Sequence, residues 1–272
     1  MSLIARVNNR LYLLKKFLYQ KLHRKRVNKK LVFVMGCQRS GTSMLMNIFY
    51  KDINIKTYKE SESLFYGSGK RFLRLKETIE VEKKLKGDNV DVIVAKPLLD
   101  SQLVVELLNK YKDSRCIWIY RDYKDVAASN LKQFGDNNGH KDLAYIVAND
   151  KEDWRAEKVS AESLKVISEL YNSSSSNLDS AALFWYVRNR IFFDNNLQHD
   201  SRVKLCKYED LVSRPENVIS DLYDFMGMEG FDKNVVSGVH RKSVSKGSSC
   251  SLNHEVDSLC KKLMGKLDEY YG

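Results

Sequence analysis

The sequence has only two prolines among 272 residues and no acidic residue before Asp52. It also lacks an uncharged apolar run of about 18 residues, the length needed to cross a bilayer, so we expect no transmembrane helix. The basic N-terminus has no compact apolar run followed by small residues, so we expect no secretory signal peptide. A hydrophobic content of 43% excludes global disorder and fits one large domain or two small ones.

The five cysteines are odd in number and include no Cys-x-x-Cys pair. Cys37, Cys116 and Cys206 lie in or beside apolar strand-like runs, which predicts buried thiols in a reducing compartment. None of the five histidines has zinc-ligand spacing with these cysteines, so we predict no metal site. We therefore expect a cytoplasmic protein.

The positive charge is concentrated at the N-terminus, where twelve Lys or Arg residues precede Asp52. The remaining 34 basic and 35 acidic residues nearly balance, which argues against a nucleic-acid partner. Residues 3–26 show apolar residues at helical spacing and predict a basic amphipathic helix within an N-terminal segment 1–30. We favour a helix that packs its apolar face on the domain and leaves its basic face solvated. Attachment to an anionic membrane surface, at the inner face of the membrane, is the alternative.

Apolar runs alternate with helical patterns along the rest of the chain. Strands are predicted at 31–35, 53–58, 90–95, 116–120 and 203–206. Helices are predicted at 42–50, 69–86, 101–111, 124–134, 157–172, 178–197, 215–226 and 254–270. Continuous apolar strands that alternate with helices indicate an α/β fold, a parallel sheet flanked by helices. We expect a single domain over 31–272, with a helical insertion at 140–200 as an acceptor wall.

The segment Gly36-Cys-Gln-Arg-Ser-Gly-Thr-Ser43 follows a predicted strand and opens a predicted helix. Backbone N–H groups and a helix N-terminus in such a loop form an anion site. The loop resembles the Walker A phosphate loop of P-loop NTPases, but Thr42 stands where that motif has the Lys that reaches the β- and γ-phosphates. In this sequence the positive charge lies instead inside the loop, at Arg39. This argues against, without excluding, a P-loop kinase or NTPase.

A second phosphate site is suggested by Arg121, at a predicted strand end, and Ser129, eight residues further on in the next helix. Near the helix start, an Arg and a hydroxyl can both face a phosphate. Two phosphate sites on one sheet suggest a nucleotide phosphorylated at two places. An Arg–carboxylate pair and a surface Ser are the simpler interpretation of this pair taken alone.

At three places the sequence resembles the sulfotransferases that use 3′-phosphoadenosine-5′-phosphosulfate (PAPS). GCQRSGTS is similar to the 5′-phosphosulfate loop of that family, and IYRDYKDVAASN to its 3′-phosphate motif. KYEDLVSRPENVISDLYDFMGM is similar to its late strand-loop-helix signature. The resemblance covers about residues 31–230 and is strong for the carbohydrate and tyrosyl-protein branches, which carry RSGT.

The resemblance implies roles for individual residues. The donor PAPS would be bound through Arg39, Ser40, Gly41, Thr42 and Ser43 at its 5′-phosphosulfate and through Arg121 and Ser129 at its 3′-phosphate. Tyr208 would lie near the nucleotide, and the loop 241–248 would cover the 3′-phosphate through Lys246 and Gly247, with Arg241 or Lys242 as alternatives. The catalytic residues would be Glu60 as base, with Glu62 as its rival, and Arg39 and Lys96 beside the transferring group.

The acceptor is expected to be a hydroxyl of a saccharide, with a protein tyrosine as second choice. Trp154, Trp185, Tyr145 and Tyr186 are candidate aromatic platforms for a sugar, although core packing explains Trp185 and Tyr186 equally well. A catalytically silent basic protein that binds an anionic membrane or polysaccharide through residues 3–30 is a third hypothesis. Cys37 is interpreted as a small apolar filler rather than a nucleophile.

Overall fold

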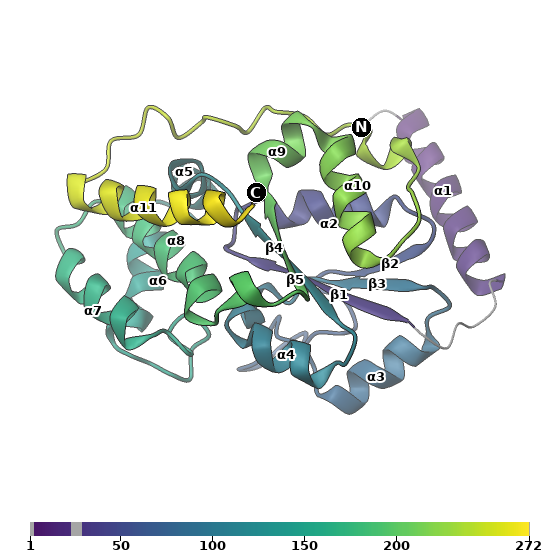
Figure 1. The fold of residues 1–272 in the computed structure, drawn as a ribbon, viewed down its shortest axis with the longest axis horizontal. Coiled ribbons are helices and arrows are strands. Elements are labelled where there is room, and N and C mark those ends of the chain that lie inside the picture. The colour runs from purple at the N-terminus through teal and green to yellow at the C-terminus, as the bar shows by residue number, and fades with distance from the viewer. Residues whose placement is uncertain (1–2, 23–28, 272) are drawn as a thin grey trace.

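The chain forms one parallel β-sheet with helices on both of its faces, as the sequence predicted (Figure 1). The computed structural model describes residues 3–22 and 29–271, with the side chains of the first helix described from Arg10 onward. The sheet has five strands in the order β2-β3-β1-β4-β5. Its strands are β1 (Lys30–Gly36), β2 (Ile55–Tyr58), β3 (Val92–Ala95), β4 (Arg115–Tyr120) and β5 (Val203–Lys207).

The helices of the described residues follow each strand and fill the segment between β4 and β5. They are α1 (Leu3–Leu22), α2 (Thr42–Tyr50), α3 (Thr78–Gly87), α4 (Val104–Lys110), α5 (Tyr123–Phe134), α6 (Asn138–Val147), α7 (Ala161–Leu170), α8 (Asn177–Asp194), α9 (Tyr208–Ser213), α10 (Pro215–Met226) and α11 (His254–Tyr271). Short 3₁₀ helices span Leu98–Leu103, Leu197–His199 and Lys233–Val236.

The two faces of the sheet carry separate cores because successive side chains of a strand point to opposite faces. In β1, Val32 and Val34 pack with α2 and α10, whereas Phe33 and Met35 pack with α4, α8 and α11. All four side chains are fully buried. This burial on both faces explains why the strands read as continuous apolar runs rather than as alternating ones.

One predicted helix begins much later than expected. Residues 69–77 belong to a loop, and α3 starts only at Thr78. Leu73 adopts a positive φ of 63°, and Phe65 pairs with Leu75 in an isolated antiparallel bridge. The Asp100 carboxylate accepts hydrogen bonds from Arg74 Nε at 2.5 Å and from the Leu75 N–H at 2.7 Å. These tertiary contacts hold the segment in a hairpin-like loop, although its charged residues favoured a helix.

The insertion at 140–200 contains three helices where the sequence predicted two. The additional helix, α6, precedes the others and packs on α8. The serines before α8 form a hydrogen-bonded turn. Ser176 caps α8 by accepting a hydrogen bond from the Asp179 N–H at 3.0 Å, and Asn172 accepts one from the Ser174 N–H at 2.9 Å.

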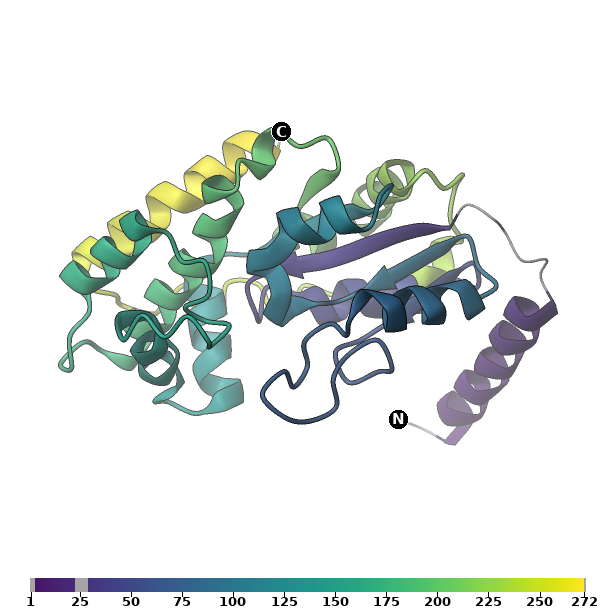
Figure 2. The same cartoon turned by 90° about the horizontal axis from the view of Figure 1, so that it is seen from below.

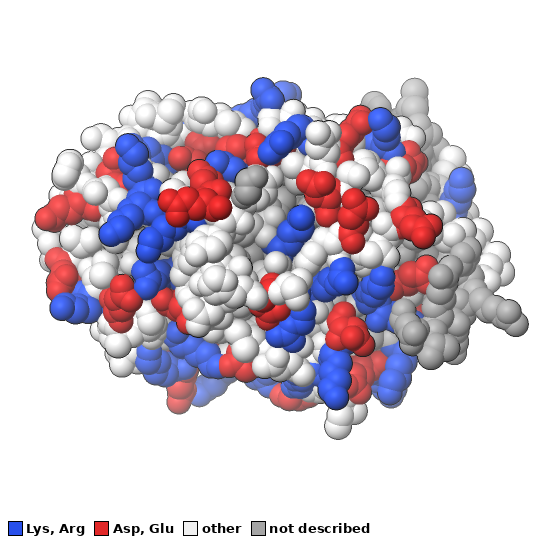
Figure 3. Space-filling model, in the orientation of Figure 1, with Lys and Arg blue, Asp and Glu red and all other residues white. Residues whose placement is uncertain are grey.

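The N-terminal helix α1 lies outside the two layers of helices, at the end of the molecule opposite the tips of the strand arrows (Figure 2). The predicted positions 23–26 of this helix lie outside the described residues. Within the part of the chain that the structure describes, no helix is both long and apolar enough to span a bilayer. On the face of the molecule drawn in Figure 3, basic and acidic side chains are interspersed, in keeping with the near balance of charge after residue 51.

Candidate active site

Every strand of the sheet delivers one of the predicted site residues at or just beyond its carboxyl end. Because all five strands are parallel, these ends meet at one edge of the sheet, where ligands bind in folds of this kind. In the order of the strands across the sheet, the residues are Glu60, Lys96, the loop 36–43, Arg121 and Tyr208.

The loop 36–43 has the backbone of an anion site. Gly36 and Gly41 adopt positive φ values of 132° and 98°, which favour glycine. A Cβ on Gly36 would lie 2.2 Å from the carbonyl oxygen of Ile119 in β4, so the loop approaches its neighbour too closely for a side chain. The loop then turns directly into the N-terminus of α2 at Thr42, where free N–H groups carry partial positive charge.

Two buried hydrogen-bond donors at this edge have no partner among the described residues. They are the hydroxyl oxygen of Ser40, in the loop, and Nε of Arg121, at the end of β4. Both residues are at most 5% exposed. A buried polar atom without a partner costs free energy, and an anion bound in the loop would supply the missing acceptor. The donor set therefore fits the phosphates of PAPS.

Tyr208 joins the loop to the second predicted phosphate site. Its ring lies directly against Gly41, where an added Cβ would come within 2.3 Å of the tyrosine Cδ2. The guanidinium of Arg121 lies over the same ring, 4.4 Å from its centroid. The tyrosine thus fixes Arg121 beside the loop.

Arg39 and Ser129, predicted at opposite phosphates, touch each other. Nε of Arg39 donates a hydrogen bond to the Ser129 hydroxyl at 3.1 Å, and Nη1 of Arg121 donates to the Arg39 carbonyl at 3.4 Å. Burial lowers the pKa of Arg39, and the charge of Arg121 lowers it further. Two guanidinium groups held this close favour an anion between them or beside them.

The buried carboxylate of Asp125 ties the late loop to this site. Its Oδ2 accepts hydrogen bonds from Arg121 Nη2 and from the Ser245 N–H, each at 2.9 Å. Its Oδ1 accepts a hydrogen bond from the Gly247 N–H at 2.6 Å, and Arg121 Nη2 also donates to the Ser243 carbonyl. Sequence reasoning missed Asp125, although its position four residues after Arg121 in the same motif was a usable signal.

These contacts place part of the loop 241–248 beside the site. Gly247 lies on the first turn of α5, where a Cβ on Gly247 would meet the Lys124 backbone at 2.3 Å. Arg241 is directed elsewhere, because its Nη2 donates to the Ser213 carbonyl at the end of α9, at 3.2 Å. The segment 243–247 therefore lies against Arg121 and Asp125, and the choice between Lys242 and Lys246 stays a prediction.

The other end of the site holds the predicted catalytic pair. Nζ of Lys96 forms an ion pair with Oε2 of Glu60 at 2.7 Å and donates a hydrogen bond to the Ser43 hydroxyl at 3.3 Å. Both side chains of the pair are largely buried, 8% and 18% exposed. Glu62 is turned away into its own loop, where its Oε2 accepts a hydrogen bond from the Lys59 N–H at 3.0 Å. Of the two glutamates, Glu60 is the one in contact with the site.

A polar cluster from the insertion borders the loop 36–43. Asp142, in the middle of α6, accepts hydrogen bonds from Gln38 of the loop at 3.2 Å, from Asn138 at 2.8 Å and from Arg155 at 2.8 Å. Burial raises the pKa of the Asp142 carboxyl, and Arg155 opposes that shift. This contact places α6 and the segment after it beside the loop.

The aromatic residues of the insertion are mostly packed away from solvent. Trp185 and Tyr186 are at most 4% exposed and belong to the core. Trp154 packs between the guanidinium groups of Arg155 and Arg188, with centroid distances of 5.1 and 5.0 Å. Of the four predicted platforms only Tyr145 is exposed, at 39%, and Arg155 covers one of its faces.

Two further expectations concern nucleophiles and metals. Cys37 is fully buried, and burial raises the pKa of its thiol to about 12, so it stays protonated near neutral pH. Among residues 3–22 and 29–271, no group of three or more His, Cys, Asp or Glu side chains is placed to hold a metal ion.

Comparison with known proteins gives one family. The model of the sulfotransferase domain matches residues 29–262. No curated protein matches the chain. Among solved structures, the sulfotransferase domain from the curacin biosynthetic pathway has a TM-score of 0.49 at 14% identity, covering 90% of this chain and 99% of that one. The sulfotransferase domain of the Synechococcus PCC 7002 olefin synthase has a TM-score of 0.48 at 14% identity, covering 89% and 98%. The mouse sulfotransferase SULT7A1, solved with PAP, has a TM-score of 0.47 at 13% identity, covering 90% and 86%.

Proposed function

Because this chain belongs to the sulfotransferase domain family, whose enzymes take their sulfuryl group from PAPS, we propose that it transfers that group to a hydroxyl of a saccharide. The observation that carries the proposal is the order of groups along the carboxyl edge of the sheet. An acid–base pair lies at one end, the anion-binding loop in the middle, and the Arg121–Ser129 site at the other end. A donor with phosphates at two positions fits this order.

The loop and the Arg121 site together hold the donor. The free N–H groups at the start of α2, with the hydroxyls of Ser40 and Thr42, bind the 5′-phosphosulfate. Arg121, Ser129 and the segment 245–247 bind the 3′-phosphate, and Tyr208 holds Arg121 in place. When bound, PAPS supplies the sulfuryl group, whose bond to the 5′-phosphate breaks as a bond to the acceptor oxygen forms.

Glu60 is the general base in this proposal. Its carboxylate takes the proton of the acceptor hydroxyl as the oxygen of that hydroxyl attacks sulfur. Lys96 holds Glu60 in position and also reaches the loop through Ser43, so it lies between the base and the leaving phosphate. Lys96 and Arg39 stabilise the negative charge that develops on the leaving oxygen. Arg39 acts through its charge alone, because a guanidinium does not give up its proton near neutral pH.

A saccharide acceptor is supported by the polar character of the wall beside the loop. The cluster of Gln38, Asp142 and Arg155 offers donors and acceptors for several hydroxyl groups. Arg74 contributes a second charged cluster, largely buried, through its ion pairs with Asp100 at 2.5 Å and with Glu157 at 2.8 Å. Several hydroxyl groups of a saccharide can exchange hydrogen bonds with such polar side chains, whereas the apolar frame of a steroid cannot. In this proposal the segment 140–200 is the acceptor wall.

The first test is calorimetric titration with adenosine 3′,5′-bisphosphate, against AMP and ATP, with and without Mg²⁺. We expect tight binding of the bisphosphate alone, independent of Mg²⁺. Preference for ATP with Mg²⁺ would instead favour the alternative that the chain is a P-loop kinase or NTPase. If no nucleotide binds, the hypothesis of a catalytically silent basic protein that binds an anionic membrane or polysaccharide would be favoured.

The acceptor is tested by transfer of labelled sulfate from PAPS to a panel of oligosaccharides, a tyrosine peptide and a simple phenol. Label in the oligosaccharides supports the saccharide assignment, whereas label only in the peptide or the phenol would refute it. The cytoplasmic location expected from the sequence stays a proposal, and fractionation of cells that express the chain tests it.

A further inference from the structure

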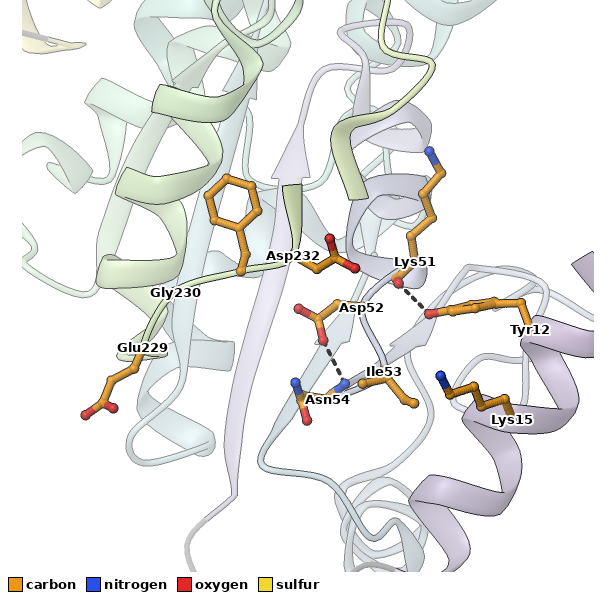
Figure 4. A pocket seen from close by; sticks show the side chains of 10 residues that line it. Tyr12, Lys15, Lys51, Asp52, Ile53, Asn54, Glu229, Gly230 and Asp232 are labelled. Carbon is orange, nitrogen blue, oxygen red and sulfur yellow. Dashed lines mark hydrogen bonds between the residues drawn. The ribbon is translucent and has the colours of Figure 1, made fainter. Parts of the chain in front are cut away.

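The helix α1 is attached to the rest of the protein by its polar side. Nζ of Lys16 donates a hydrogen bond to the Tyr50 carbonyl at 2.6 Å, and Gln20 Nε2 donates to the Ile53 carbonyl at 3.0 Å. Tyr12 donates to the Lys51 carbonyl, the contact drawn in Figure 4. Lys16 is only 5% exposed. The contacts therefore bury a lysine and leave other faces of the helix outside.

Between Arg10 and Leu22, most of the large apolar side chains of α1 are exposed to solvent. Five large side chains are between 46% and 82% exposed, namely those of Leu11, Leu14, Phe17, Leu18 and Leu22. Four of them follow one another at intervals of three or four residues, so they form a stripe along one face. This arrangement is the reverse of the one favoured from the sequence, in which the apolar face packs on the domain. Contiguous apolar groups on a solvent-exposed surface mark a site of contact with another molecule or a membrane.

Basic side chains border the stripe on both sides. Successive residues of an α-helix are rotated by about 100° around its axis. This rotation places Lys15 on one flank of the stripe and places Arg10 and Lys21 on the other. All three are exposed, and Lys21 Nζ lies 5.8 Å from the centroid of the Phe17 ring. Long basic side chains placed in this way can hold their charges at the polar boundary while the apolar groups between them are buried.

The hollow beside α1 does not provide an alternative site for an anion. It lies between α1 and the chain at 51–54 and 229–232 (Figure 4). Its lining brings together two lysines, Lys15 and Lys51, and three carboxylates, Asp52, Glu229 and Asp232. The charges of this lining offset one another, so the binding chemistry of this end of the molecule lies in the stripe and its flanks.

We infer that α1 docks the protein on an anionic lipid bilayer, with the leucine stripe in the acyl boundary and the flanking Lys and Arg at the headgroups. An apolar stripe between basic flanks matches both layers of such a surface, which neither a polar protein nor a neutral bilayer does. The contact leaves the active site open. Residues 50–55, on which α1 rests, connect α2 to the start of β2, at the edge of the sheet opposite the loop 36–43 (Figure 2).

The test is flotation of the full chain with vesicles of phosphatidylcholine alone and of phosphatidylcholine with phosphatidylglycerol. Leu14→Ser with Leu18→Ser removes apolar area without changing charge, and Ile79→Ser on α3 is its control because Ile79 is 82% exposed. Lys15→Glu with Lys21→Glu reverses the flanks. Its control is Lys165→Glu with Lys261→Glu, on α7 and α11, which changes the net charge equally at exposed positions remote from α1.

We expect the wild type and both controls to float with the anionic vesicles only. Reversal of two flanking charges is expected to weaken binding about 30-fold or more. The serine variant is expected to weaken binding about tenfold or more. All variants should bind adenosine 3′,5′-bisphosphate like the wild type, which shows that they are folded and separates this inference from the proposed function.

Three outcomes would overturn the inference. The first is failure of the wild type to float with either vesicle. The second is loss of binding in the flank variant alone, with the serine variant unaffected, which would indicate adsorption by charge without the stripe. The third is a dimer of the wild type in solution that the serine variant dissociates while no form floats, because the stripe would then be covered by a second copy.

Discussion

The Asp125 carboxylate offers the sharpest test of how the 3′-phosphate site is built. It is 2% exposed and accepts three hydrogen bonds, from the Arg121 guanidinium and from the backbone N–H groups of Ser245 and Gly247. In Asp125→Asn, only one of the two terminal atoms remains an acceptor. The amide NH₂ group donates and does not accept. It must then face either the Gly247 N–H or the two donors from Arg121 and Ser245.

The variant therefore loses at least one hydrogen bond to a charged group, worth about 1.5–3 kcal/mol. We expect this loss to appear in two measurements. The free energy of unfolding in denaturant should fall by about that amount. If the loop 241–248 must also be reordered when the ligand binds, the Kd for adenosine 3′,5′-bisphosphate should rise about 10- to 150-fold.

Asp122→Asn is the matched control. Asp122 caps the same helix and accepts a hydrogen bond from the Asp125 N–H at 3.0 Å, but among the described residues no hydrogen bond joins its side chain to the segment 245–247. Asn caps a helix about as well as Asp, so this variant changes the charge equally and should bind normally. This role of Asp125 would be refuted by a folded Asp125→Asn that binds the bisphosphate within about twofold of the wild type, or by equal weakening of binding in both variants.

Two further predictions concern the rest of the site. Glu60→Gln should lower kcat for sulfate transfer about 10²- to 10⁴-fold with unchanged bisphosphate affinity, whereas Glu62→Gln should stay within about twofold because its amide oxygen still accepts from the Lys59 N–H. Equal losses in the two variants would remove Glu60 from the role of base. Gly41→Ala should cost about 2–4 kcal/mol in denaturant unfolding and weaken bisphosphate binding, because the residue has a φ of 98° and its Cβ would meet a tyrosine ring at 2.3 Å. An unchanged unfolding midpoint would contradict the close contact.

The fold class followed from the sequence because burial on both faces of a parallel sheet leaves a local mark. Strands such as 31–35 and 116–120 are unbroken apolar runs, and each is followed by a helical pattern. The phosphate loop was equally readable, since its strand, glycines and helix start are contiguous. Their backbone conformation depends mainly on neighbours in the chain.

Where the sequence failed, the deciding contacts came from distant segments. The loop at 69–77 has a charged, helix-like composition, yet Asp100 from the next strand connection holds it open through Arg74 and Leu75. Helix propensity is a small free energy per residue, and a buried ion pair with two hydrogen bonds outweighs it.

The catalytic residues themselves were nameable from the sequence, but their relations were not. Glu60 and Glu62 are indistinguishable by spacing, and only the position of β3 beside β2 brings Lys96 to one of them. The contact between Arg39 and Ser129 likewise depends on β4 lying next to β1. Strand order is set by the burial of the whole sheet, so no local pattern contains it.

The N-terminal helix shows the same division between what the sequence determines and what the tertiary contacts determine. Its periodicity determined that it is a helix with one apolar and one basic side. Which side faces the protein depended on the surface it meets, and the carbonyl groups at 50–55 accept hydrogen bonds from its tyrosine, lysine and glutamine side chains. The sequence by itself determined most of the helices and strands and the chemistry of the loop 36–43. The tertiary structure decided which groups meet, because those choices depend on partners far away along the chain.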